Sequence, residues 1–472
     1  MRTALLLVLC GVCSAADLAP KLTTLVESAP IAVRGVAGVH VVDLATGATV
    51  YAYNENQLLM PSSNLKLFTA ALALARLGPD YRSETRLLRE PSGSLALIGS
   101  GDPSMSGRAY PYDASAKMLP TMHTINELAD QAVAAGLRRV DGDIVGDDSR
   151  YHWSPYPESW TADDAQHAFG APVSALALND NAVTITVRPG TSVGGLARVE
   201  LDPLFEYFQI DNRVVTGTAS SVQAQRIPGT RQVVLTGTIN SRGPAALETL
   251  AVDDPALFTA HALYDALLRR GVTVRGRPVA RHLSGTPSTA EGALLASRKS
   301  PPLAELLRTT IKVSQNLHAE MLLREVAYVK KGQGTVDDGL RELKSMLTEL
   351  GISQAAVVSE DASGLARNNE ATPRAVTQLL AAMAAGPLRD LWRGLLPVGG
   401  QDGTLSNRLC CSVESVSIRA KTGTLTRAVA LSGYADSPAN GHLAFSILVN
   451  NFSAPAAEVR AWVDSVASAL VE

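Results

Sequence analysis

The sequence contains few of the residues that would indicate a disulfide-stabilised, metal-binding or nucleic-acid-binding protein. Only four of its 472 residues are cysteines. Cys410 and Cys411 are neighbours, and adjacent cysteines bond to each other only through a strained ring, so we interpret them as unpaired thiols. Their spacing does not fit a metal site, and nothing in the sequence indicates a metal or organic cofactor. No basic block is present, which argues against nucleic acid as a partner.

Long apolar runs are also absent after the first residues of the chain. The N-terminal segment has Arg2, then an apolar stretch from 4 to 12, then the small residues 14–16. This pattern predicts a cleaved secretory signal over residues 1–16, with a buried first helix as the alternative. No later run reaches about 18 apolar residues, so we expect no integral membrane segment in the mature chain. The protein should therefore be periplasmic or otherwise exported.

What remains is a chain of ordinary globular composition. Hydrophobic residues make up 46% of it, charged residues 18%, and the net charge is −3. Length and composition together suggest two or three domains with enough apolar material for a core. Lysine accounts for only nine of the 42 Lys and Arg residues. A lysine inside a motif is therefore less expected by chance than an arginine.

The patterning divides the chain into a front, a middle and a back. Alternating residues at 36–54 predict a β-hairpin, and residues 65–77, apolar on every face, predict a helix buried on all sides with Ser62 or Ser63 as its N-cap. Short β-like runs dominate from about 90 to 289. Helical periodicity returns at 302–350. Strands are expected at 414–421, 427–436 and 442–452, followed by a helix at 456–471 that favours core packing over a membrane anchor.

This layout predicts that the front and back share one sheet and that the middle is an insertion. The expected division is 17–89 plus 290–472 for a discontinuous catalytic domain. Residues 90–289 form a β-rich insertion, expected to have two subdomains.

One feature of the buried helix needs a chemical explanation. Its first turn carries Ser63 and Lys66, three residues apart and therefore on one face. A serine hydroxyl becomes a good nucleophile when a base takes its proton, and a lysine can be that base only when it is neutral. Burial and a second nearby cation both lower the pKa of a lysine. The alternative is a capping serine beside a lysine whose charge reaches solvent.

Two further motifs favour the catalytic interpretation. Ser314-Gln315-Asn316 lies between helical runs, and Lys421-Thr422-Gly423 lies at the end of a predicted strand. The order S-x-x-K, S-x-N, K-T-G is the signature of β-lactamases and penicillin-binding proteins. No G-x-S-x-G or H-E-x-x-H motif is present, and the eight histidines are scattered. We interpret His318, next to the S-Q-N motif, as a structural histidine.

Each motif residue has a predicted task. Ser314 passes a proton to the leaving amine, and Asn316 holds Lys66 or a substrate amide. Lys421 supplies positive charge for a substrate carboxylate and keeps Lys66 deprotonated. Gly423, beside Thr422, lets the substrate lie along the strand as an added strand. The backbone N–H groups of Ser63 and Thr424 are the predicted oxyanion hole.

At these residues the sequence resembles the class C low-molecular-mass penicillin-binding proteins, the D-alanyl-D-alanine carboxypeptidase/endopeptidase family. The resemblance runs from about residue 36 to the end and includes PSSNLKLFTAALAL, LIGSGDPSM, DASGLARNN and RAKTGTL. It implies an α+β multidomain fold: a β-lactamase/transpeptidase-like catalytic domain with a five-stranded antiparallel sheet flanked by helices, and a large β-rich insertion. About 250 residues separate Ser63 from Ser314, which suits that insertion.

The resemblance also implies a reaction and its partners. Ser63 would attack the peptide carbonyl of peptidoglycan stem peptides ending in D-Ala-D-Ala, and related members also cut cross-bridges. β-Lactam antibiotics would be covalent inhibitors. Asp164 and Phe169 would lie near the amino group of the diaminopimelate side chain, with Arg367 facing its carboxylate; an exposed charge or a core aromatic is the alternative for each.

Two departures from the family pattern concern specificity more than activity. The middle motif reads S-Q-N where S-D-N is common, and Thr426 stands where some relatives have glutamine. Two other functions stay open at this point. A β-lactamase or esterase could use the same fold, although no E-x-x-L-N is present and Ala175 stands where its acid would be. A non-catalytic cell-wall-binding scaffold would have no need of a buried lysine beside a serine.

Overall fold

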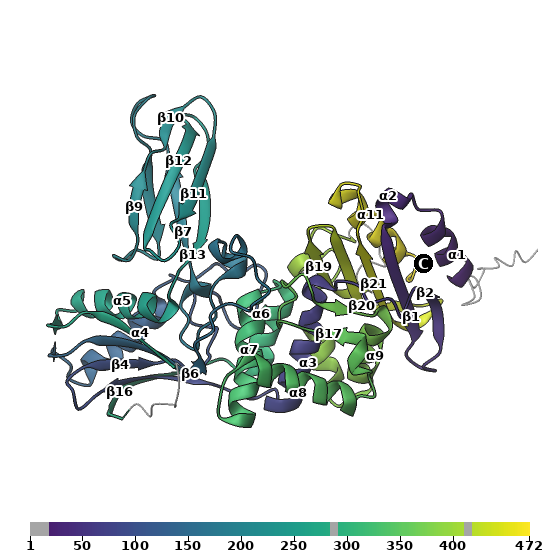
Figure 1. Ribbon diagram of the computed structural model, residues 1–472, viewed down its shortest axis with the longest axis horizontal. Coiled ribbons are helices and arrows are strands. Elements are labelled where there is room, and N and C mark those ends of the chain that lie inside the picture. The colour runs from purple at the N-terminus through teal and green to yellow at the C-terminus, as the bar shows by residue number, and fades with distance from the viewer. Residues whose placement is uncertain (1–17, 284–290, 410–417) are drawn as a thin grey trace, which may run out of the picture.

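The computed structural model describes residues 18–283, 291–409 and 418–472. Figure 1 shows two bodies connected by helices, with one sheet next to the C-terminus at one side and several sheets at the other. The predicted signal peptide, 1–16, and the pair Cys410 and Cys411 lie outside the described residues. Within the described ranges, no helix has the length and apolar character needed to cross a membrane.

A five-stranded antiparallel sheet joins the front of the chain to its end. The strand order is β19-β20-β21-β1-β2, and each neighbouring pair is antiparallel. The predicted hairpin supplies two strands and the back of the chain supplies three: β1 Val36–Asp43, β2 Thr49–Tyr53, β19 Ile418–Leu425, β20 Ala428–Ser437 and β21 Gly441–Asn450. The expectation that front and back share one sheet is confirmed. The K-T-G motif, however, lies inside β19 and not at the end of a strand.

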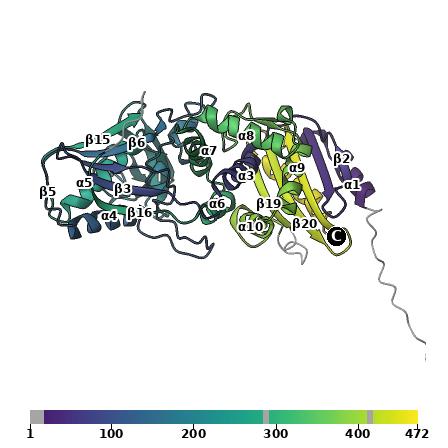
Figure 2. The same cartoon turned by 90° about the horizontal axis from the view of Figure 1, so that it is seen from below.

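Helices cover both faces of this sheet (Figure 2). On one face, α1 (Leu18–Glu27) and α11 (Ala456–Ser468) pack against alternate strand residues such as Val39 and Ile447. The C-terminal helix thus packs into the core, as predicted. The other face carries a helical layer with its own apolar core: α3 Leu65–Leu77, α6 Leu303–Lys312, α7 Asn316–Lys331, α8 Val336–Glu349, α9 Pro373–Ala385 and α10 Arg389–Leu395.

Helix α3 is buried as the sequence predicted, but its N-cap is not a serine. Ser62–Asn64 form one turn of 3-10 helix, and Asn64 occupies the cap position without a capping side-chain hydrogen bond. The prediction failed because Ser62, with φ of 49°, does not have the extended conformation of a capping residue, and the Ser63 hydroxyl contacts Lys66. Asn64 Nδ2 donates to Ser432 Oγ of β20 at 2.8 Å, which fastens the turn to the sheet.

The middle of the chain forms three sheets of three or more strands, besides the short pair of β14 and β5. A five-stranded sheet, β15-β6-β4-β3-β16, carries α4 and α5, and two smaller sheets, β13-β7-β8 and β10-β12-β11 with β9, stand apart from it in Figure 1. Their bounds are β3 Glu84–Arg89, β4 Leu95–Ile98, β6 Ile144–His152, β7 Ala182–Arg188, β8 Arg198–Asp202, β9 Gln209–Asn212, β10 Val215–Gly217, β11 Ser221–Arg226, β12 Gln232–Asn240, β13 Ala246–Ala251, β15 Pro278–Leu283, β16 Ala293–Lys299, α4 His123–Ala134 and α5 Pro255–Leu268.

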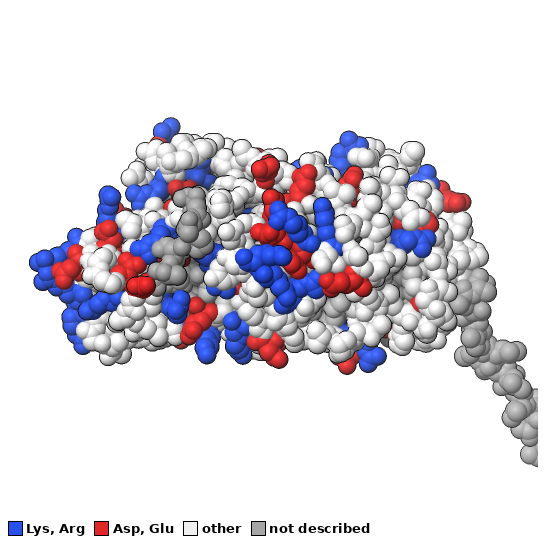
Figure 3. All heavy atoms as spheres, turned by 60° about the horizontal axis from the view of Figure 1, so that its bottom comes forward, with Lys and Arg blue, Asp and Glu red and all other residues white. Residues whose placement is uncertain are grey.

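The remaining four strands and one α-helix of the described residues are short. They are β5 Arg139–Val140, β14 Thr273–Val274, β17 Val357–Val358, β18 Glu370–Ala371 and α2 Ile31–Arg34. The predicted domain limits stay a prediction. At those limits, β3 and β16 pair with each other inside the inserted sheet, so the chain enters and leaves the insertion side by side. Figure 3 shows positive and negative side chains interspersed over one face of the molecule.

Candidate active site

The side chains of Ser63 and Lys66 meet at the start of α3. Lys66 Nζ lies 2.9 Å from Ser63 Oγ, 2.6 Å from Asn316 Oδ1 and 2.6 Å from the backbone oxygen of Ser363. The Lys66 side chain is completely buried, in the first turn of an apolar helix. A one-turn spacing on α3 therefore places the amine directly against the serine hydroxyl.

The environment of Lys66 favours a neutral amine. Burial lowers the pKa of Lys66 to about 7, although the charges of Asp361 and Glu320 act to raise it. A neutral amine has two N–H groups and one lone pair. Asn316 Oδ1 and Ser363 O are acceptors only, so they take the two N–H groups. The lone pair is then left for the proton of the Ser63 hydroxyl.

The turn before the nucleophile is under conformational strain. Ser62 has φ of 49°, in the left-handed region that non-glycine residues adopt at a cost of about 1–3 kcal/mol. Its hydroxyl is buried and has no hydrogen-bond partner among the described residues. Strain of this kind persists where surrounding contacts enforce it, and here the turn presents Ser63 to the cavity.

The second lysine contacts the second serine. Lys421 Nζ, on β19, lies 2.8 Å from Ser314 Oγ and donates to the carbonyl of Thr422 at 2.7 Å. Lys421 is completely buried, and burial followed by the proximity of Lys66 lowers its pKa well below the usual value. No carboxylate among the described residues stabilises the positive charge predicted for Lys421. A substrate carboxylate beside this amine would stabilise its charged form and raise the pKa of Lys421.

Asn316 is the first residue of α7 and links three parts of the site. Its Oδ1 faces Lys66, and its Nδ2 donates to the backbone carbonyl of Phe169 at 2.8 Å. Phe169 comes from the inserted region, stacks on His167 at 5.1 Å between ring centroids, and is 47% exposed. Phe169 is thus no core aromatic, and this segment of the insertion lines the site.

These residues surround a cavity of about 340 Å³. It is lined by Ser63, Asp164, Phe169, Ser314, Asn316, Gly364, Leu365, Arg367, Thr424, Leu425 and Thr426. The three motifs and the three residues predicted for side-chain recognition are therefore brought together in one place, with Lys66 and Lys421 buried beneath its wall.

Asp164 and Arg367 form an ion pair in the lining of this cavity. Arg367 Nη1 and Nη2 donate to the two carboxylate oxygens of Asp164 at 2.7 and 3.1 Å. Burial acts to raise the pKa of Asp164, but hydrogen bonds from Thr161 and Arg367 outweigh it and hold that pKa below its usual value. The charges predicted to bind two ends of a substrate side chain are therefore bound to each other. Their role in recognition stays a prediction.

The K-T-G strand packs tightly against the nucleophile turn. A Cβ added to Gly423 would lie 2.8 Å from Pro61 O and 3.0 Å from Ser62 Cβ. Thr422 Oγ1 donates to Thr404 Oγ1 at 2.8 Å. The sequence explained Gly423 by the approach of substrate, whereas the nearest neighbours of this position belong to the protein's own turn.

Three contributors to the site were not recognised from the sequence: Glu320, Asp361 and Ser363. Glu320 Oε1 accepts from the N–H groups of Ala362 and Ser363, both at 2.9 Å, and Glu320 also pairs with buried Arg324. A buried acid four residues past the S-Q-N motif, and the DASG tetrapeptide at 361–364, were the available signals. His318 is fully buried and lies 3.1 Å from Asp180, consistent with a structural role.

Comparison with known proteins identifies the family. The sequence profile of the D-Ala-D-Ala carboxypeptidase 3 (S13) family matches residues 18–470. The chain belongs to this family. Over 443 residues it is 35% identical to the D-alanyl-D-alanine carboxypeptidase of Actinomadura sp. (strain R39), covering 89% of this chain and 79% of that protein. The resemblance inferred from the motifs is thereby confirmed, and the protein is a serine-type D-Ala-D-Ala carboxypeptidase, a peptidase among the hydrolases.

Other S13 relatives agree with this assignment. The D-alanyl-D-alanine carboxypeptidase DacB of Haemophilus influenzae is 25% identical over 417 residues, covering 85% of this chain and 82% of that protein. The crystal structure of penicillin binding protein 4 (dacB) from the same organism superimposes with a TM-score of 0.80 at 22% identity, covering 96% of this chain and 99% of that one. At that identity the structural likeness supports the fold, and it confirms the predicted fold class.

Proposed function

We propose that this S13 protein cleaves the terminal D-Ala-D-Ala bond of peptidoglycan stem peptides through an acyl-enzyme on Ser63. One observation carries the proposal: Lys66 Nζ lies 2.9 Å from Ser63 Oγ in a buried environment that favours the neutral amine. The lone pair of that amine is therefore directed at the Ser63 hydroxyl. A lysine whose pKa lies near working pH is a suitable general base.

Acylation then follows from the positions of the side chains. Lys66 Nζ takes the hydroxyl proton, and Ser63 Oγ attacks the carbonyl carbon between the two D-alanines. The backbone N–H groups of Ser63 and Thr424 are assigned to the developing oxyanion. When the C–N bond breaks, the leaving amine takes a proton from Ser314 Oγ, which lies 2.8 Å from Lys421 Nζ. The proton that Lys66 took from Ser63 then replaces the one given up by Ser314, so that Lys66 is neutral again and Ser314 is again a hydroxyl. Water later attacks the ester and releases the shortened peptide.

Lys421 is assigned to the terminal carboxylate of the substrate. The Lys421 amine is buried beside Lys66, an arrangement that disfavours a proton on both amines. A carboxylate bound at Thr422 and Thr424 would stabilise the proton on Lys421, and that charge in turn would keep Lys66 neutral. Binding of a C-terminal carboxylate would therefore prepare the base, which suits a carboxypeptidase.

The Asp164–Arg367 pair is assigned to the substrate's side chain. An amino acid side chain that ends in both an ammonium and a carboxylate, as diaminopimelate does, can exchange partners with an ion pair without leaving a charge unpaired. Arg367 is 40% exposed and Asp164 5% exposed, so the guanidinium is the group free to move. Cross-bridge cleavage, as an endopeptidase, would use the same subsite.

β-Lactams are proposed as acylating inhibitors of Ser63. The Haemophilus influenzae protein of the same fold has been crystallised in complex with a novel β-lactam. We also propose that the mature protein works outside the cytoplasm, at the cell wall, because stem peptides are found there and the N-terminal sequence resembles a secretory signal.

The test is the intact mass of the mature protein with and without benzylpenicillin, alongside Ser63→Ala. We expect one covalently bound penicillin in the unmodified protein and none in Ser63→Ala, followed by D-alanine release from a stem-peptide substrate. Intact drug and unmodified protein would refute the acyl-enzyme and favour a wall-binding scaffold. Consumption of the drug without an adduct would instead indicate a β-lactamase or esterase.

A further inference from the structure

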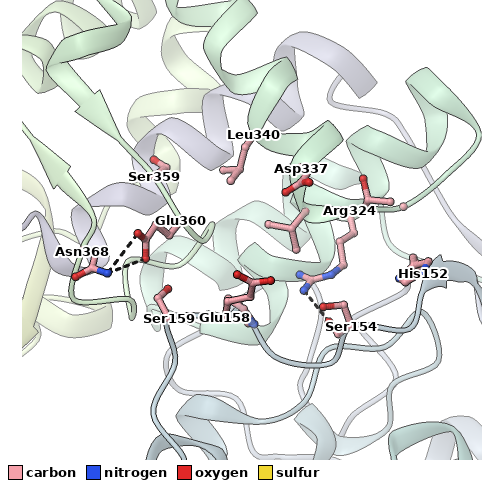
Figure 4. Close-up of a pocket in the computed structure, with 14 residues that line it drawn as sticks. His152, Ser154, Glu158, Ser159, Arg324, Asp337, Leu340, Ser359, Glu360 and Asn368 are labelled. Atoms are coloured by element: carbon pink, nitrogen blue, oxygen red, sulfur yellow. Dashed lines mark hydrogen bonds between the residues drawn. The ribbon is translucent and has the colours of Figure 1, made fainter. Parts of the chain in front are cut away.

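A short segment, residues 359–368, separates the active-site cavity from a second cavity of about 730 Å³. Gly364, Leu365 and Arg367 line the first cavity, and Ser359, Glu360 and Asn368 line the second. Figure 4 shows Glu360 and Asn368 joined by two hydrogen bonds on the wall of the second cavity. We call residues 359–368 the partition loop.

The partition loop is organised around one buried carboxylate, Asp361. Its side chain is completely buried, and it accepts three backbone N–H groups of its own loop: those of Gly364 at 2.8 Å, Leu365 at 3.0 Å and Ala366 at 2.7 Å. Three side chains also donate to it: Asn369 Nδ2 at 2.8 Å, Trp160 Nε1 at 2.9 Å and Ser363 Oγ at 3.3 Å. Trp160 belongs to the inserted region, so this carboxylate ties the insertion to the loop.

The same carboxylate controls a group that touches Lys66. The N–H of Gly364 and the carbonyl of Ser363 belong to one planar peptide unit. When Asp361 holds that N–H, the direction of the Ser363 carbonyl is fixed, and this carbonyl lies 2.6 Å from Lys66 Nζ. Gly364 has φ of +81°, and a Cβ there would lie 1.9 Å from Ser62 O, so the loop is also pressed against the nucleophile turn.

We propose that Asp361 is a positioning residue for the general base: it orients the Ser363 carbonyl that holds Lys66, and its charge acts on the Lys66 amine. The proposal rests on the function given above, in which Lys66 takes the Ser63 proton. Asp361 itself touches neither substrate nor the reacting atoms.

The negative charge of Asp361 acts to raise the pKa of Lys66. Among the described residues, the charged groups that act on Lys66 are Lys421 of β19, Glu320 of α7 and Asp361 of the partition loop. Asp361 and Glu320 stabilise the protonated amine and so oppose burial, which lowers the pKa of Lys66 to about 7. Removal of the Asp361 charge therefore lowers the pH at which Lys66 loses its proton.

Asp361→Asn separates this role from a purely structural one. Both carboxylate oxygens of Asp361 accept N–H groups, and asparagine would replace one of these oxygens by an NH₂ group that cannot accept. The loop should therefore loosen, and acylation should slow on the order of 10²-fold. The acid limb of the pH profile for acylation by benzylpenicillin should move down by about one unit. Rates are measured per molecule that can be acylated, so a loss of folded protein does not affect them. A slower variant whose limb stays at the wild-type pH would overturn the proposal.

Two further variants complete the test. Glu360→Gln removes the neighbouring charge on the other face of the loop. Its acylation rate and the acid limb of its pH profile should match those of the wild-type protein. An acid limb shifted as in Asp361→Asn would refute the specific role of Asp361. Trp160→Phe removes one hydrogen-bond donor to Asp361 and keeps the charge of Asp361. Acylation should therefore slow several-fold while the acid limb of the pH profile stays in place, and this result can be obtained even if Asp361→Asn does not fold. A wild-type rate for Trp160→Phe would refute positioning through the loop. Failure of the proposed function can be told apart from failure of the Asp361 proposal, because the wild-type protein itself would then form no penicillin adduct.

Discussion

Asn316 of α7 and Phe169 of the inserted region are joined by a hydrogen bond from Asn316 Nδ2 to the Phe169 carbonyl at 2.8 Å. The other end of the same amide, Oδ1, lies 2.6 Å from Lys66 Nζ. The bond decides which end of the amide faces the lysine. The insertion therefore takes part in the geometry of the catalytic site although its sheets lie outside the catalytic fold.

This relationship predicts the effect of Asn316→Asp. A carboxylate cannot donate to the Phe169 carbonyl, and its negative charge next to Lys66 raises the pKa of that amine. Acylation by benzylpenicillin at pH 7 should fall on the order of 10²-fold, with partial recovery as pH rises. Asn440→Asp, in the turn between β20 and β21, is the control and should acylate normally. An Asn316→Asp variant with the wild-type rate would contradict the role of this contact.

The pH dependence of the wild-type enzyme follows from Lys66. The base is active when neutral, so kcat/KM for D-alanine release should rise through pH 7 and fall about tenfold per unit below it. Initial rates between pH 5 and 9 measure this limb. A profile that stays flat down to pH 5.5 would mean that a group other than Lys66 takes the proton.

Gly423→Ala tests the fit between β19 and the nucleophile turn. The new methyl group would meet Pro61 O and Ser62 Cβ, so the turn must move by a few tenths of an ångström. We expect acylation about 10- to 100-fold slower and a loss of about 1–2 kcal/mol in unfolding free energy. Gly217→Ala, whose nearest neighbour would be 3.7 Å away, is the matched control. Equal behaviour of the two variants would show that the close packing at Gly423 is unimportant.

The recognition role of the Asp164–Arg367 pair predicts a split between substrates. Arg367→Ala should raise KM for a diaminopimelate-containing stem peptide by about tenfold, the cost of one lost charged hydrogen bond. Acylation by benzylpenicillin, which lacks that side chain, should change little. The comparison requires the two rates on one preparation. An equal loss for both compounds would instead assign Arg367 to the shape of the cavity.

Stability at alkaline pH should depend on His282 in the insertion. Its two ring nitrogens lie 2.9 Å from Asp148 Oδ1 and 3.3 Å from Asp254 Oδ2. Burial acts to lower the pKa of His282, but the bonds to these carboxylates raise it to about 10. The contribution is present in full below the unfolded-state pKa of about 6.5 and is lost as pH rises through 10.

Urea unfolding at several pH values checks this contribution. His282→Ala should lose about 3 kcal/mol at pH 6, since it leaves the buried Asp148 unpaired, and the difference should shrink above pH 10. The exposed pair of His442 and Asp436 offers a control, because His442→Ala should cost less than about 1 kcal/mol. A His282→Ala deficit that is the same at pH 6 and pH 10.5 would rule out the charged form as the cause.

Sequence reasoning reached the residues whose spacing is fixed by local structure. Ser63 and Lys66 are one helical turn apart, and the apolar residues around them already predicted a buried amine. The alternation at 36–54 similarly predicted the hairpin that pairs with the last strand of the sheet. These features depend on short segments, which carry their own periodicity.

The remaining site features depend on contacts between distant segments. No local pattern places Asp361 beneath Trp160, which is 201 positions away, or makes Arg367 a partner of Asp164. The N-cap of α3 was predicted wrongly for a related reason. Local rules favour a serine cap, but Ser63 contacts Lys66 and Asn64 donates to Ser432 of β20, and these contacts decide the conformation.

The strand order of the five-stranded sheet has a consequence for biogenesis. Strands β1 and β2, made first, have no neighbour on their inner side until β21 has been made, because β1 pairs only with β2 and β21. The inserted sheets, by contrast, are complete once residue 299 has been synthesised. The nucleophile helix α3 must therefore wait, during synthesis, for a surface to pack on. The insertion can fold first and remain tied to the unfinished half by two adjacent strands, so catalytic competence arises as the last step of chain completion.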